Sequence, residues 1–220
     1  MGQIKDFLTS NHLKTKRDYH ARSVNEKPVF ATLAKKFDQD YWDGPREIGY
    51  GGYKDDGRWS GVAEKFLSFY NLSENASILD IGCGKGFLLN QLHIKRPDLK
   101  IKGIDVSSYA LNNAPSSVRP FLEIGSAENA NFEKNSFDLV VSLNTLHNLE
   151  LPDLVSALKK IESFSNGKSY ICVESYSSEQ EKWNLMRWQL TCEAFYTPRE
   201  WEWIFSLANY TGDYEFIFFE

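Results

Sequence analysis

The chain has 220 residues, 42% of them hydrophobic and 25% charged, with a formal net charge of −5 at pH 7. This length suits one domain with a sizeable core, and the acidic balance argues against the broad basic face of a nucleic-acid-binding protein. The sequence has no apolar run of membrane-spanning length. The cysteines are odd in number and lack the spacing of metal ligands; they are Cys83, Cys172 and Cys192. We therefore expect a cytoplasmic protein with no metal site and no membrane partner, and a nucleic-acid partner is disfavoured.

The first sixty residues have an irregular pattern. Apolar residues recur at helical spacing from Pro28 to Phe37, which predicts a short helix. Residues 43–61 then combine glycines with aromatic side chains and show no periodicity, as is typical of a structured loop. A helix is expected from Val62 to Tyr70. We expect residues 1–60 to form a lid segment and residues 61–220 to form the main domain, within one compact unit.

The rest of the chain alternates short apolar runs with segments of helical periodicity. Strands are expected at Ile78–Ile81, Ile101–Val106, Phe121–Ile124, Phe137–Leu143, Ser169–Ser175 and Tyr214–Phe219, and helices at Phe87–Ile94, Ser107–Asn113, Pro152–Phe164, Lys182–Glu193 and Pro198–Ala208. Continuous apolar runs are typical of parallel strands that are buried on both faces. The pattern predicts an α/β fold with a doubly wound, mostly parallel sheet flanked by helices.

A glycine-rich turn, GCGKG at residues 82–86, follows the first of these strands. A phosphate-binding P-loop would need a hydroxyl residue after Lys85, but Gly86 stands there. A dinucleotide-binding fingerprint would need its third glycine at position 87, but that residue is Phe87. Two interpretations are left. In one, bare backbone approaches another kind of ligand; in the other, the turn only packs a helix on the sheet.

The stretch LDIGCGKG, residues 79–86, resembles motif I of the class I S-adenosylmethionine-dependent methyltransferases. Two later segments add to the resemblance: Asp105 at the end of the next strand, and IGSAENANFEKNSFDLVVSLNTLHNL at residues 124–149. The resemblance covers residues 76–175. It implies a Rossmann-like fold, methyl transfer, S-adenosylmethionine as cofactor with S-adenosylhomocysteine as product, and no metal.

The end of the chain departs from this family pattern. Methyltransferases of this fold usually finish with two antiparallel strands. Here only Tyr214–Phe219 is evident after the last helix. Either Cys192–Tyr196 serves as a further strand, or one strand is missing.

The resemblance also implies which residues bind the cofactor. The glycine turn would surround the methionine portion, Asp105 would accept the ribose hydroxyls, and Val106 would lie on the adenine face. Ser126 stands where the family most often has aspartate, so its hydrogen bond to the adenine amino group would lack charge assistance. Asn144 matches the position that contacts the methionine end. The full set is Asp80, Gly82, Cys83, Gly84, Gly86, Asp105, Val106, Ser126, Ala127, Glu128 and Asn144.

The methyl acceptor is expected at the carboxyl ends of the strands, where open α/β sheets bind their ligands. An oxygen or nitrogen acceptor must lose a proton, and His147 and Glu174 follow strands at this edge. Each has a structural alternative, because a histidine can simply line the pocket and a strand-end carboxylate can be satisfied by its neighbours. Tyr176 and Trp188 are expected to line the acceptor pocket.

The stretch GYGGYKDDGRW, residues 49–59, is expected to close over this site. Tyr50, Tyr53 and Trp59 would offer aromatic faces to the cationic sulfonium. Arg58 would pair with the methionine carboxylate or with an acidic acceptor. The alternative is a loop that packs on the edge of the sheet.

Together these features predict a methyltransferase that moves a methyl group from S-adenosylmethionine to an oxygen or nitrogen of a small molecule. A methyltransferase acting on a protein or RNA is the alternative among enzymes, and the lack of a basic channel or tail disfavours it. A regulatory protein that binds S-adenosylmethionine without catalysis is the alternative outside them. The sequence leaves the acceptor and the oligomeric state open.

Overall fold

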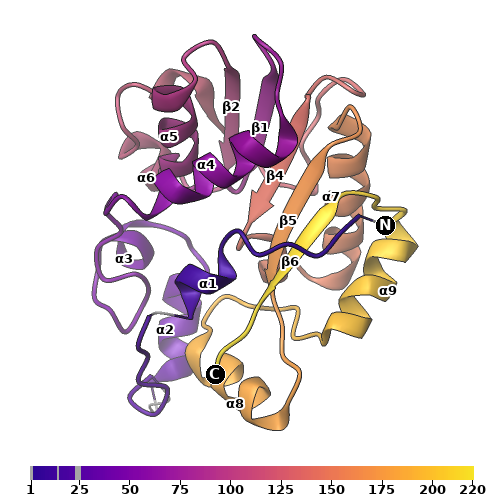
Figure 1. Cartoon of the computed structure of the whole chain (residues 1–220). Coiled ribbons are helices and arrows are strands. Elements are labelled where there is room, and N and C mark those ends of the chain that lie inside the picture. Colours follow the sequence, from indigo (N-terminus) through magenta and orange to yellow (C-terminus); the bar gives the residue numbers. More distant parts are fainter. Residues whose placement is uncertain (1, 14, 23–25) are drawn as a thin grey trace.

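The structure is a computed structural model that describes residues 2–13, 15–22 and 26–220 (Figure 1). The strands are β1 (Ser77–Ile81), β2 (Lys100–Asp105), β3 (Leu122–Ile124), β4 (Leu139–Leu143), β5 (Ser169–Glu174) and β6 (Asp213–Ile217). The helices are α1 (Thr9–His12), α2 (Lys27–Ala34), α3 (Gln39–Trp42), α4 (Arg58–Tyr70), α5 (Phe87–Lys95), α6 (Ser108–Asn112), α7 (Leu151–Phe164), α8 (Glu179–Trp188) and α9 (Pro198–Ala208), with 3₁₀ turns η1 (Arg119–Phe121) and η2 (Leu146–Asn148). Every strand expected from the sequence is present, with bounds that shift by at most a few residues.

The six strands form one sheet in the order β3-β2-β1-β4-β5-β6, and every pair is parallel. This confirms the doubly wound α/β fold. Of the two alternatives left open for the end of the chain, the missing strand is confirmed: no antiparallel strand joins the sheet within the described residues, and β6 pairs parallel to β5, with Glu174 opposite Ile217. The chain reaches β6 through α8 and α9, so it crosses over and re-enters the sheet in the same direction, and such a crossover joins parallel strands. Residues 192–196 form no strand.

The sheet separates two hydrophobic clusters, and its strands supply both. In β5, Tyr170 and Cys172 belong to the cluster with residues of α4 and α5, whereas Ile171 and Val173 belong to the cluster with residues of α7 and α9. All four side chains are fully buried. This is why the strand reads as a continuous apolar run, since alternate side chains enter opposite layers and neither face meets water.

The start of the chain completes the edge of the sheet. Residues 2–5 run alongside β6 (Figure 1), where the Lys5 backbone N–H donates to the Tyr214 carbonyl at 2.9 Å. The buried carboxylate of Glu215 accepts the backbone N–H groups of Phe7 and Leu8 at 2.8 and 2.9 Å. These first residues therefore pack into the fold and lie away from the helices that cover the carboxyl edge.

The middle of the N-terminal segment lies elsewhere. Helices α2 and α8 lie at the lower side of Figure 1, and α3 lies above α2 at the left. Helix α4 starts at Arg58, so the expected boundary between residues 60 and 61 falls inside a helix. The last expected helix before residue 193 ends at Trp188, because Gln189 takes an extended backbone. The division at residue 60 and the lid function stay predictions.

Candidate active site

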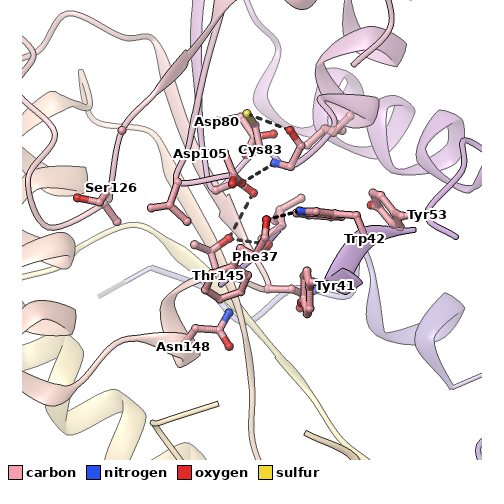
Figure 2. A pocket seen from close by; sticks show the side chains of 18 of the residues that line it. Phe37, Tyr41, Trp42, Tyr53, Asp80, Cys83, Asp105, Ser126, Thr145 and Asn148 are labelled. Atoms are coloured by element: carbon pink, nitrogen blue, oxygen red, sulfur yellow. Dashed lines mark hydrogen bonds between the residues drawn. The ribbon is translucent and has the colours of Figure 1, made fainter. Parts of the chain in front are cut away.

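A cavity of about 190 Å³ lies at the carboxyl ends of β1, β2 and β4 (Figure 2). Every residue expected to bind the cofactor lines it, except Gly86; they are Asp80, Gly82, Cys83, Gly84, Asp105, Val106, Ser126, Ala127, Glu128 and Asn144. Gly86 faces away, toward the apolar side chains of Val118 and Leu122. The topology explains the gathering, because the carboxyl ends of parallel strands share one edge and the connecting loops meet there.

The glycines of the turn have positive φ angles, 79° at Gly82 and 55° at Gly84. A Cβ atom on Gly82 would lie 2.0 Å from Thr145 Oγ1, and one on Gly84 would lie 2.8 Å from the Trp42 ring. L-residues with side chains rarely adopt these φ angles. The expectation of bare backbone facing a ligand is therefore only part of the reason for glycine here, since close protein neighbours also require it.

Asp105 is held by the backbone around it. Its carboxylate accepts the N–H of Gly84 at 2.7 Å and the N–H of Ser107 at 2.8 Å. Burial raises the pKa of Asp105, and these two backbone hydrogen bonds oppose the rise. Each carboxylate oxygen keeps further acceptor capacity for a ribose hydroxyl. The Ser107 side chain caps α6 by accepting the N–H of Ala110, so Asp105 is not needed as the cap.

Asp80 differs from Asp105 in lacking a partner. Its carboxyl group is buried on the cavity wall, and no side chain or backbone group within the described ranges donates a hydrogen bond to it. Burial, and after it the charge of Asp105, raises the pKa of Asp80 to about 8. A cationic group in the cavity would favour the ionised form. The cavity therefore suits a ligand that carries positive charge.

Aromatic side chains form the wall opposite Ser126. Figure 2 shows Tyr41, Trp42 and Tyr53 together on that side. The Trp42 indole donates to Ser107 Oγ at 2.9 Å, and its ring stacks on Tyr50 with centroids 5.4 Å apart and planes 10° apart. Tyr50 and Tyr53 line the cavity as expected from the sequence.

Three aromatic residues of this wall were missed by the sequence reasoning: Phe37, Tyr41 and Trp42. The signal available was the aromatic pair in DYWDG, directly before the glycine-rich stretch. Nothing in the spacing of this aromatic pair links it to the motif I turn at residues 82–86.

Lys85 takes a function that the sequence reasoning did not assign. Its ammonium group is buried and donates to both carboxylate oxygens of Asp43 at 2.7 Å and to the Tyr53 carbonyl at 2.9 Å. Asp43 also accepts the hydroxyl of Tyr109 at 2.9 Å. The lysine of the glycine turn therefore fastens the N-terminal segment to the cofactor cavity.

A second cavity of about 490 Å³ adjoins the first. The two share wall residues Tyr41, Tyr50, Tyr53, Trp59 and Asn144. Of the residues expected at the acceptor, His147, Glu174, Arg58 and Trp188 line the second cavity. Tyr176 does not line it; its ring packs against the α4–α5 cluster with the Lys182 ammonium 5.2 Å from its centre.

His147 and Glu174 form a buried pair on the wall of the second cavity. The distance from His147 Nε2 to Glu174 Oε2 is 3.5 Å. Glu174 Oε1 accepts a hydrogen bond from the Gln189 amide, and the Glu174 backbone carbonyl accepts the Trp201 indole N–H at 3.0 Å. Burial lowers the pKa of His147 and raises the pKa of Glu174. At neutral pH the imidazole is therefore uncharged, and the carboxyl group holds its proton more tightly than an exposed one.

Arg58 and Trp59 belong to the first turn of α4 and not to the preceding loop. The Arg58 guanidinium pairs with Asp56 at 2.5 Å, so its charge is already compensated within its own segment. The Trp59 indole donates to the Tyr53 hydroxyl at 3.2 Å. These contacts hold the glycine-rich stretch against the start of α4.

The described part of the chain has neither a membrane-spanning helix nor a cluster of metal ligands. No helix there has both the length and the apolarity to cross a membrane. Within residues 2–13, 15–22 and 26–220, three or more His, Cys, Asp or Glu side chains are nowhere grouped to hold a metal ion. The expected lack of a metal and the cytoplasmic location stay predictions.

The chain is similar to known methyltransferases in sequence and in fold. Residues 72–209 match the family described as "Methyltransferase domain". The mitochondrial arginine-hydroxylase NDUFAF5 of Mus musculus is 39% identical over 84 residues, which are 38% of this chain and 24% of that protein. The phosphoethanolamine N-methyltransferase of Plasmodium falciparum is 27% identical over 128 residues, which are 56% of this chain and 48% of that protein. The YcgJ protein of Bacillus subtilis has a similar fold, with a TM-score of 0.53 and 16% identity over 66% of each chain.

The parallel sheet with a cavity at its carboxyl edge has the fold of the class I S-adenosylmethionine-dependent methyltransferases, and the family match assigns the chain to this class. The chain belongs to the methyltransferase domain family, whose match at residues 72–209 covers more than half of it. The matched stretches span 24% to 48% of the two curated relatives. Their own substrates therefore say little about the acceptor of this chain.

Proposed function

We propose that this protein transfers a methyl group from S-adenosylmethionine to an oxygen or nitrogen atom of a small molecule. The observation that carries the proposal is the pairing of two cavities. The smaller is lined by the residues expected to bind the cofactor, and the larger, which shares Asn144 and Tyr50 with it, contains the His147–Glu174 pair. A binding protein without catalysis would not need the second cavity.

The residues of the smaller cavity fit the cofactor. Asp105 would hold the ribose hydroxyls, Val106 would contact the adenine, and Asp80 would face positive charge at the methionine end. The aromatic wall around Trp42 and Tyr50 suits a sulfonium, because the faces of aromatic rings attract cations. The bound cofactor supplies a methyl group activated by its positively charged sulfur.

The larger cavity supplies a base for the proton that the acceptor loses. Transfer breaks the sulfur–methyl bond, whose electron pair stays on sulfur, and forms an oxygen–methyl or nitrogen–methyl bond. The acceptor proton leaves, and we assign it to Glu174 Oε2. Burial raises the pKa of Glu174 to about 8, so the ionised fraction that can accept this proton is small at pH 7 and grows as the pH rises toward 8. The uncharged His147 lies 3.5 Å from Glu174 Oε2 without a hydrogen bond to it, and the Gln189 amide holds the other carboxylate oxygen.

A small acceptor is favoured by the size of the larger cavity, about 490 Å³. Residues of the N-terminal segment, including Arg17 and Arg46, cover one side, and residues 188–191 cover another. A protein side chain or an RNA base would have to enter with its own chain attached. The relatives differ in what their names state, an arginine-hydroxylase and a phosphoethanolamine N-methyltransferase, so they do not select between acceptor classes.

The test is to follow S-adenosylhomocysteine formation from S-adenosylmethionine with extract fractions separated by mass. We expect product with the low-mass fraction and none with the purified protein or RNA fractions. The Glu174→Gln variant should bind S-adenosylmethionine with wild-type affinity in calorimetry and lose most turnover. Product formed only with a macromolecular fraction would contradict the small-molecule proposal, and a variant with full turnover would remove the assignment of the base.

A further inference from the structure

Three arginines of the N-terminal segment converge on one tryptophan in the larger cavity. The guanidinium carbons of Arg17, Arg22 and Arg46 lie 5.5, 5.0 and 5.1 Å from the centre of a Trp188 ring. All four residues line the cavity of about 490 Å³. Three like charges around a single ring repel one another, so the arrangement calls for a compensating group.

The described part of the chain places no carboxylate in direct contact with these arginines, although Glu174 and Glu47 act on Arg17 and Arg22 from farther away. Within the described residues, none of these three guanidinium groups has a carboxylate oxygen within 4.0 Å. Their hydrogen bonds to oxygen go to backbone carbonyls, those of His12, Thr15, Trp188, Arg46 and Gly49. Arg58 in the same cavity shows the contrast, because it is paired with Asp56.

The cavity as a whole is positively charged. Its walls hold five cationic side chains, Arg17, Arg22, Arg46, Lys54 and Arg58. The acids on the walls are Asp56, which Arg58 neutralises, and Glu174, which is mostly protonated at neutral pH because burial raises its pKa to about 8. Arg17 and Arg22 are half-buried, so solvent only partly screens them.

From this arrangement we infer that the methyl acceptor carries an anionic group, a carboxylate or a phosphate, which Arg17, Arg22 and Arg46 bind beside Trp188. The inference rests on the proposed function, since it names the substrate class of the same site. Guanidinium groups present paired N–H donors that match the two oxygens of such anions. Trp188 holds the arginines through its ring face.

The position of the arginines then orients the acceptor. They line the cavity together with Glu174, His147 and Asn144, and Asn144 also lines the cofactor cavity. An acceptor anchored by its anionic group would direct its remaining oxygen or nitrogen toward Asn144 and the Glu174 carboxylate. The arginines are therefore specificity residues, and Glu174 remains the base.

The test uses small anions as probes of the full-length protein saturated with S-adenosylhomocysteine. Inorganic phosphate, acetate and acetamide, the uncharged isostere of acetate, are titrated and followed by nuclear magnetic resonance of the tryptophan indole N–H groups. We expect saturable binding of phosphate or acetate and none of acetamide. The tighter of the two anions identifies the acceptor group.

Variants complete the test. Arg46→Met and Arg22→Met should weaken anion binding at least tenfold. The anion affinity of Arg46→Lys should fall between those of Arg46→Met and the wild type, because lysine keeps the charge but not the paired donors. Arg187→Met is the matched control, since Arg187 also lies over a tryptophan, Trp183, on α8 but does not line the cavity.

Each outcome has a clear meaning. Equal anion binding by Arg46→Met and wild type, no saturable anion binding by wild type, or acetamide binding equal to acetate would each overturn the inference. The affinity for S-adenosylhomocysteine, measured on every variant by calorimetry, should not change. A wild-type protein that fails to bind S-adenosylhomocysteine would instead refute the proposed function, so the two failures are distinct. Thermal unfolding of each variant confirms that it is folded.

Discussion

Asp80 and Asp105 share one cavity and carry the same functional group, but their surroundings give them different tasks. The Asp105 carboxylate accepts two backbone N–H groups. The Asp80 carboxyl group lies on the cavity wall, and no group among the described residues donates a hydrogen bond to it. Motif reasoning placed both acids at the cofactor. It did not distinguish them, because their donors come from the three-dimensional course of the turn.

This difference predicts proton release when the cofactor binds. Burial raises the pKa of Asp80 to about 8, so at pH 7 its carboxyl group is mostly protonated. A cationic ligand favours the ionised form, and up to one proton should leave on binding. Calorimetric titrations with S-adenosylmethionine at pH 7 in two buffers of different ionisation enthalpy measure this number. The Asp80→Asn variant should bind S-adenosylmethionine at least tenfold more weakly than the wild type and release no proton. Identical binding enthalpies in the two buffers for the wild type would refute the assignment of the released proton to Asp80.

The buried carboxyl group of Glu174 should make the free energy of unfolding depend on pH. Burial raises its pKa from the ordinary value of 4.5 to about 8, so the folded state binds this proton more tightly than the unfolded state. Stability from this group is therefore fully present below pH 4.5 and is lost as the pH rises toward 8. His147 has the opposite effect: because burial lowers its pKa, its contribution to stability is lost as the pH falls below 6.5. The clean window is pH 6.5 to 8.

Urea unfolding measures this dependence. Between pH 6.5 and 8, the free energy of unfolding of the wild type should fall more steeply than that of Glu174→Gln, by up to about 1.4 kcal/mol per pH unit. Asp80 contributes to both proteins and cancels in the comparison. Parallel pH profiles would show that Glu174 is ionised in the folded protein.

At the scale of elements, strands were easier to predict than the contacts between segments. The apolar runs at residues 78–81 and 169–175 marked strands because both faces of the sheet are buried. Helix ends were less certain, since α8 stops where the Gln189 side chain turns to Glu174. Contacts such as Trp42 with Ser107 join residues far apart in sequence and leave no periodic signature.

The contact between the N-terminal segment and the glycine turn is tested most directly at the Lys85–Asp43 ion pair. The Lys85 side chain is 6% exposed and the Asp43 side chain 27%, so solvent screens the pair weakly. In a double-mutant cycle, Lys85→Met and Asp43→Asn should show a coupling energy of about 1–3 kcal/mol in urea unfolding. Both single variants should also weaken S-adenosylmethionine binding, because Tyr53 and Trp42 lose their anchor. Additive effects on stability would mean that the pair does not hold the segment.

At the scale of the whole molecule, the N-terminal segment has two parts with different positions. Its first residues complete the sheet beside β6, and only later residues cover the two cavities. The sequence predicted the aromatic and glycine-rich cover from composition. It could not predict the edge pairing, because an edge strand partner is chosen by position in space and not by a local pattern.

Removing residues 1–10 should therefore destabilise the fold and not merely open the site. The Glu215 carboxylate would lose its backbone donors and the core would lose Phe7 and Leu8, which lowers stability by about 3 kcal/mol or more. Glu215→Gln in the truncated chain should recover part of this loss, because it removes the buried charge. Chemical unfolding of both proteins measures the effect. A truncated chain as stable as the full one would contradict the packing of the first residues.

The central claim is that one cofactor cavity opens onto one acceptor cavity, and a crystal structure with S-adenosylhomocysteine tests it most directly. We predict that the ribose hydroxyls lie on the Asp105 carboxylate and that the sulfur lies beside Asn144, facing the cavity that contains Glu174 and the three arginines. The account would be contradicted if the ligand bound outside the cavity at the GCGKG turn, or if its sulfur faced away from the cavity of Glu174.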